Sequence, residues 1–96
     1  MSRLTESLQG DGKVKSKGVY LADVHYEMAV RQSASGKRGA SGHLRVTAGE
    51  KNLLDAEDPL VLCLEDNREI TILIERWSPF DGQGSFQATG GFRPNP

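Results

Sequence analysis

Apolar and polar residues alternate along residues 18–32. Asp23, His25 and Glu27 separate apolar neighbours, so that one side of the segment is apolar. A period of two places alternate side chains on opposite faces of a β-strand, whereas a helix would distribute them around its circumference. The pattern therefore predicts a long strand over residues 18–32 with one buried face. That face consists of Tyr20, Ala22, Val24, Tyr26, Met28 and Val30.

The same period returns at 44–46, 60–64 and 70–74, and a final short strand is expected near 85–89. Glycine and proline residues interrupt the chain between these segments. Short strands separated by turns predict an all-β fold, a small antiparallel barrel or sandwich of about five to seven strands. The predicted core is Tyr20, Val24, Tyr26, Met28, Val30, Leu44, Val46, Leu60, Leu62, Leu64, Ile70, Ile72, Ile74 and Phe86.

The segment from Leu64 to Ile70 restricts how its two flanking strands are joined. Residues directly opposite each other on a hairpin share a face, so pairing Leu64 with Ile70 requires an odd number of loop residues. We therefore predict a loop of three or five residues. Asn67 is expected to take the left-handed conformation that such turns use.

The N-terminal segment has a different pattern. Leu4 and Leu8 are four residues apart, which is one turn of a helix. Ser2 can cap such a helix and Gly10 can end it. A short helical turn is therefore expected here, and disorder is the alternative. The predicted organisation is an N-terminal segment over 1–12, a single β domain over 13–90 and a C-terminal tail over 91–96.

Length and composition limit the class of protein. The chain has 96 residues, of which 36% are hydrophobic and 26% charged, as expected for one small globular domain. No apolar stretch approaches the roughly 20 residues of a membrane-spanning helix, and no secretory signal is recognisable. The single cysteine, Cys63, has no partner for an intramolecular disulfide. A cytoplasmic protein without a membrane segment is the expectation.

Residues that could support catalysis or bind a metal are few. His25, His43 and Cys63 are expected on outward faces, without the CxxC, HxH or HExxH spacing that brings ligands together. The acidic run Asp55, Glu57 and Asp58 could bind a hard cation or act as acid and base, and a solvated loop is the simpler interpretation. We predict no catalytic residue, no metal site and no cofactor, hence a protein that is not an enzyme.

Basic residues suggest one binding function. The formal net charge of −1 divides into +3 for residues 1–50 and −4 for residues 51–96. Residues 35–39 have part of the composition of a phosphate-binding loop, although Arg38 stands where the Walker pattern requires Ser or Thr. A solubilising loop is the alternative. The candidate phosphate contacts, for single-stranded nucleic acid or RNA, are Lys13, Lys15, Lys17, Lys37 and Arg38. Tyr20 and Tyr26 are expected to face inward, where neither could stack on a base.

Apolar residues that are expected on the outward faces of the strands suggest a second binding function. Val61 is expected opposite Leu73, and Cys63 opposite Thr71. Either the protein itself covers this surface, with its N-terminal segment or a neighbouring strand of a closed barrel, or a protein partner or a second copy of the chain does. The leading hypothesis is a small protein-interaction or accessory module, with Val61, Leu73 and Trp77 as its contact residues.

The sequence resembles two families of small barrels in part. PilZ domains, which bind a cyclic dinucleotide, also combine a basic loop with six strands, but their RxxxR element is absent because Ser35 stands four residues after Arg31. No segment satisfies their D/NxSxxG element. Residues 64–70 resemble the β-turn segment of Sm-like RNA-binding barrels, a similarity confined to one hairpin. Neither resemblance assigns a family.

Overall fold

The protein is built entirely from β-strands over the part of the chain that the computed structural model describes, residues 3–32, 38–53, 59–89 and 93–94. No helix in this part is long and apolar enough to cross a membrane. The strands are β1 (Arg3–Ser16), β2 (Val19–Gln32), β3 (Arg38–Gly49), β4 (Leu60–Cys63), β5 (Arg68–Ser78), β6 (Gln83–Ala88) and β7 (Arg93–Pro94).

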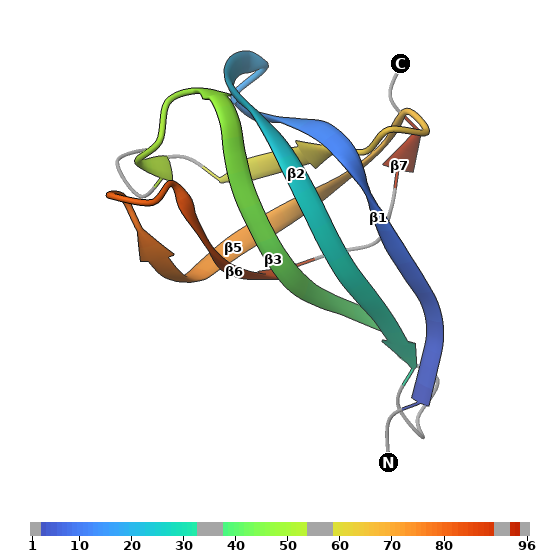
Figure 1. Ribbon diagram of the computed structural model, residues 1–96. Coiled ribbons are helices and arrows are strands. Elements are labelled where there is room, and N and C mark those ends of the chain that lie inside the picture. The colour runs from blue at the N-terminus through green and yellow to red at the C-terminus, as the bar shows by residue number, and fades with distance from the viewer. Residues whose placement is uncertain (1–2, 33–37, 54–58, 90–92, 95–96) are drawn as a thin grey trace.

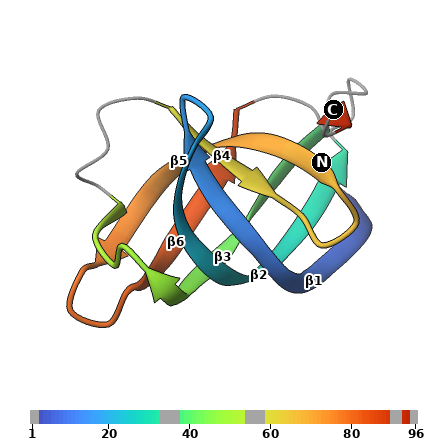
Figure 2. The same ribbon diagram turned by 90° about the horizontal axis from the view of Figure 1, so that it is seen from above.

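The six longer strands form one antiparallel sheet that closes into a ring. Strands β1, β2 and β3 are neighbours in chain order, and so are β4, β5 and β6. Pairing of β3 with β6 and of β1 with β4 joins the two groups (Figure 1). Figure 2 shows the same strands from above. Closure removes most of the exposed sheet edge and confirms the prediction of a small all-β antiparallel fold.

The interior is filled by the even-numbered positions of the long strands. Most of the predicted core residues are buried, and Ile74 is half-buried at the edge of the core. The structure adds Val14, Ala40 and Leu53 to the core, and it buries Ala22, which the alternation places on the inward face. Tyr20 was predicted to be in the core and is exposed, so that prediction is wrong. The physical reason is a register shift, described with the site below.

The expected N-terminal helix is absent, because residues 3–16 form β1. This strand pairs with β2 along its whole length. Its inward positions are Leu8, Gly10, Gly12 and Val14, which follow a period of two. The glycines at two of these positions interrupt the apolar pattern, and Gly10 has the form of a helix stop in the sequence. The domain boundary predicted at residue 13 consequently falls inside β1.

The β4–β5 hairpin has the predicted kind of loop. Leu64 N–H donates to the Arg68 carbonyl at 2.7 Å, which leaves the three residues from Glu65 to Asn67 in the loop. Asn67 has a φ of 70°, so its predicted left-handed conformation is confirmed. The register differs by two residues from the one proposed, because Leu62 rather than Leu64 lies opposite Ile70.

Close packing at Gly12 joins β1 to β4. A Cβ atom at this position would overlap the Cys63 carbonyl oxygen and would lie 3.2 Å from the Tyr26 ring. At Gly10 a Cβ would overlap the Glu65 carboxylate and lie 3.2 Å from the Tyr26 hydroxyl oxygen. That hydroxyl oxygen accepts the Glu65 N–H at 3.1 Å. The two glycines therefore leave the space in which Tyr26 reaches from β2 to the end of β4.

Gly12→Ala is expected to destabilise the fold by about 1–3 kcal/mol, because the added methyl group overpacks the contact between β1 and β4. Urea denaturation measures this loss. Gly39→Ala is the matched control, since a Cβ at Gly39 meets nothing within 4 Å. Equal stability of the two variants would contradict the packing described for Gly12.

Candidate functional site

The β1–β2 hairpin carries a group of lysines at one end of the barrel. Its turn consists of Lys17 and Gly18, with φ of 52° and 77°, and Ser16 lies opposite Val19. Positive φ at both central residues is the geometry whose twist suits a two-residue hairpin. Lys17 therefore lies at the tip, while Lys13 and Lys15 precede it on the outer face of β1.

Tyr20 lies on the same outer surface as these lysines. The register between β1 and β2 shifts near the turn, where Val14 lies opposite Ala22 but Lys15 lies opposite Tyr20. One extra residue in β2 reverses the direction of the side chains beyond it. Tyr20 is 47% exposed as a result, and Lys13 Nζ lies 5.9 Å from the centre of its ring. Alternation in the sequence gives no sign of this shift.

Asp23 is the anionic neighbour of Tyr20. Desolvation raises the pKa of the Tyr20 hydroxyl, the negative charge and side-chain hydrogen bond of Asp23 raise it further, and a backbone hydrogen bond of Asp23 opposes the shift. Because the neutral phenol is favoured, the hydroxyl keeps its proton at physiological pH. The ring is thus uncharged and has an ammonium group over it. Such a cation–π pair is typical of aromatic residues that remain accessible at a protein surface.

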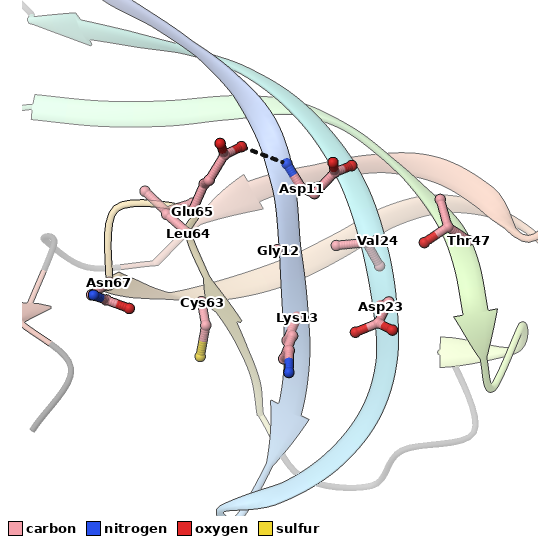
Figure 3. A pocket seen from close by; sticks show the side chains of 10 residues that line it. All are labelled: Asp11, Gly12, Lys13, Asp23, Val24, Thr47, Cys63, Leu64, Glu65 and Asn67. Atoms are coloured by element: carbon pink, nitrogen blue, oxygen red, sulfur yellow. Dashed lines mark hydrogen bonds between the residues drawn. The ribbon is translucent and has the colours of Figure 1, made fainter.

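An open pocket of about 540 Å³ adjoins Lys13 on the outer surface of β1, β2 and β4 (Figure 3). Asp11, Asp23 and Glu65 contribute carboxylates to its lining and Lys13 contributes an ammonium group. Glu65 Oε2 accepts the Asp11 N–H at 3.0 Å, and the Asp11 carboxylate lies 3.2 Å from Nδ1 of His25. The pocket therefore combines both signs of charge, which disfavours a purely anionic or purely cationic ligand.

The remaining predicted phosphate contacts are not part of this surface. Lys37 lies outside the described residues. Arg38 begins β3 opposite Gln32, at the end of β2 far from the Lys17 turn (Figure 1). The structure brings Lys13, Lys15 and Lys17 together and places Arg38 at the other end of the long strands.

The predicted apolar patch is also divided. Leu73 is 56% exposed in the middle of β5. Val61 is half-buried and lies opposite Thr71 rather than Leu73, so the two residues are diagonal neighbours. Cys63 lies opposite Glu69, not Thr71, because of the same difference in register.

Trp77 lies apart from these two residues. A register shift between Ile74 and Arg76 turns Trp77 toward the edge of the core, where its Nε1–H donates to the Lys51 carbonyl at 2.8 Å. Phe80, in the turn after β5, is 96% exposed and was not among the predicted contacts. Its neighbours Pro79 and Gly82 mark a turn in the sequence, which is the signal for an exposed position.

The candidate metal and nucleophilic residues do not converge. His25 lies opposite Asp11 and Arg45, and His43 lies opposite Glu27 and Ser85. Within the described ranges, no group of three or more His, Cys, Asp or Glu residues could hold a metal ion. The acidic run Asp55, Glu57 and Asp58 falls outside those ranges.

Cys63 is a packed thiol. It is 8% exposed, and its Sγ lies 3.9 Å from an oxygen of Glu69. Burial raises the pKa of the thiol; Lys15 opposes this shift and Glu69 adds to it. A raised pKa leaves less of the reactive thiolate at neutral pH. These features describe a structural cysteine.

Comparison of the sequence with protein-family models and with curated proteins, and of the structure with solved structures, gives no match.

The Cys63 thiol should react with iodoacetamide more slowly than free cysteine at mildly alkaline pH, because burial limits both access and ionisation. Mass spectrometry of the folded protein over time measures the rate, and the urea-unfolded chain provides the control. Equal rates in the two states would contradict the burial of this side chain.

Proposed function

We propose that the protein is a non-catalytic binding module that contacts single-stranded nucleic acid with its β1–β2 hairpin. The observation that carries this proposal is the position of Tyr20, an exposed aromatic ring on the outer surface beside Lys13. Proteins that bind single strands combine aromatic side chains, on which bases stack, with cationic groups that contact phosphates.

The hairpin offers both kinds of contact within a few residues. A base can stack on the face of the Tyr20 ring that Lys13 leaves open, while Lys15 and Lys17 are placed to contact the adjacent phosphates. Stacking requires only a planar ring, so binding is expected to depend little on base sequence. Val19, which is 62% exposed next to Tyr20, widens the apolar part of this surface.

Nearby carboxylates set the strength of the interaction. Asp23 lies beside Tyr20, and Asp11 and Glu65 line the adjoining pocket. Their charge opposes phosphate, so contact is restricted to the two or three phosphates nearest the lysines. With about 0.7 counterions released per phosphate of a single strand, the logarithm of affinity should fall with the logarithm of salt concentration with a slope between about −1.4 and −2.

Tyr20→Ala should weaken binding of a mixed-sequence, fluorescently labelled single-stranded oligonucleotide by about 5- to 150-fold, which corresponds to about 1–3 kcal/mol of stacking. Tyr20→Phe keeps the ring and should retain most of the affinity. Fluorescence anisotropy at low and moderate salt gives the affinities, and two-dimensional amide NMR locates the contacts at residues 13–20.

Lys17→Asn removes one charge and keeps a residue that tolerates positive φ, so it should reduce the magnitude of the salt slope by about 0.7. Arg76→Ala on the outer face of β5 removes an equal charge elsewhere and should leave the slope unchanged. Absence of binding at low salt, or equal affinity of Tyr20→Ala and the unaltered protein, would contradict the proposal.

A second candidate function is supported by Leu73, whose exposed apolar side chain lies within a regular strand. With Val61 it forms a small surface suited to a protein partner. Leu73→Asp should leave the fold intact and abolish binding of proteins that the unaltered domain retains. Thr47→Asp, at an exposed position on β3, is the control. Identical sets of proteins bound by both variants would contradict this second function.

A further inference from the structure

Tyr20 begins a row of outward side chains that crosses from the β1–β2 hairpin to β4 and β5. Lys15 pairs with Tyr20 on one side and with Val61 on the other. Val61 in turn lies opposite Thr71 on β5. Residues directly opposite each other share a face of the sheet, so these four residues form one cross-strand row on the outer surface. Because neighbouring strands are about 4.8 Å apart, the cross-strand row is about 14 Å long.

Leu73 extends the apolar part of this surface at the far end of the cross-strand row. It follows Thr71 by two residues on the same face of β5, and it is 56% exposed. Val61, its diagonal neighbour, is half-buried. The exposed Tyr20 ring and these two aliphatic side chains are thus parts of one surface, and Lys15 lies between them.

The charge of the cross-strand row is positive, since Lys15 is its one charged member. Burial raises the pKa of the Cys63 thiol and Lys15 opposes this shift, so the Lys15 ammonium group acts as far as β4. Lys17 adds a second positive charge on the side of the row that is nearer the hairpin turn.

The adjacent row, on the side away from the turn, has acidic members. Lys13 lies there between Asp23 on β2 and Cys63 on β4 (Figure 3). Cys63 lies opposite Glu69 on β5. The carboxylates of Asp23 and Glu69 repel phosphate, although they can accept hydrogen bonds from the N–H groups of bases. Phosphate is therefore favoured on the Lys17 side of the cross-strand row.

We propose that the bound single strand continues from Tyr20 along the cross-strand row to Leu73, with its phosphates on the Lys17 side and its bases over the row. The inference rests on the proposed function and extends the contact from one stacked base to a path across four strands. A polymer of planar bases and anionic phosphates matches a surface on which a ring and aliphatic side chains flank an ammonium group. The path suits about four nucleotides, the low end of the site sizes of small barrels that bind single strands.

The length of oligonucleotide that binds tests this path. Unlabelled thymidine oligonucleotides of two, four and eight nucleotides compete with the labelled oligonucleotide in fluorescence anisotropy at low salt. Affinity should rise steeply from two to four nucleotides, because only the longer chain reaches β5. From four to eight it should rise only with the number of equivalent positions on the chain. Equal affinity for two and four nucleotides would overturn the path, since the strand would then contact the hairpin alone.

Two substitutions at the far end of the path test it in the full chain. Thr71→Glu places a negative charge there and should weaken binding of the eight-nucleotide strand by about fivefold. Leu73→Ser removes apolar surface without adding charge and should weaken it by about threefold. Ser7→Glu adds the same charge as Thr71→Glu at an exposed position of β1 remote from the row, so it should leave the affinity unchanged.

Two-dimensional amide NMR establishes that each variant is folded. In the unaltered protein, the amides of Val61, Thr71 and Leu73 should shift on binding together with those of residues 13–20. Unchanged affinity of both far-end variants, with weaker binding by Tyr20→Ala, would overturn the path and leave the proposed function in place. Absence of binding by the unaltered protein would overturn both. Loss of a bound protein in Leu73→Ser, with unchanged affinity for the oligonucleotide, would assign Leu73 to a protein partner and overturn the path.

Discussion

The packing of Tyr26 against Gly10 and Gly12 is the constraint on which the closure of this barrel depends. The ring extends from β2 across β1, and its hydroxyl oxygen accepts the N–H of Glu65 at the end of β4. Side chains at the two glycine positions would occupy the same space. Because β1 carries none there, β2 and β4 approach it from both sides, and the sheet closes with a buried interior. The Glu65 carboxylate, held at this junction, then covers the Asp11 N–H.

Closure of the sheet also determines which side chains remain at the surface. Two of the register shifts in the sheet, near Leu21 and between Ile74 and Arg76, bear on these surfaces. The first turns Tyr20 outward to join the lysines of the β1–β2 hairpin. The second turns Trp77 inward and separates it from Leu73. Local irregularities of the sheet therefore decide the composition of both candidate binding surfaces, and the regular parts of the strands supply the scaffold.

The sequence predicts the regular parts well, because a buried face imposes a period of two on the residues that form it. The inward side of β2 from Val24 to Val30, the pair Ile70 and Ile72, and the conformation of Asn67 all follow from that rule. Strand β1 does not show this period clearly, because glycines occupy two of its inward positions. A glycine in the sequence indicates a turn, and nothing near Gly10 and Gly12 in the sequence shows that the Tyr26 ring fills the space beside them. The position of Tyr20 and the two-residue difference in the β4–β5 register depend on pairing between strands, which alternation within one strand does not encode.

Nuclear Overhauser contacts in the uniformly labelled protein test the closure of the barrel around Tyr26 most directly. The account predicts cross-strand backbone contacts between Lys13 and Cys63 and between Lys15 and Val61, together with Gly12 α-protons shifted by the adjacent Tyr26 ring. Sequential contacts typical of a helix over residues 4–8, with no contact between β1 and β4, would contradict it.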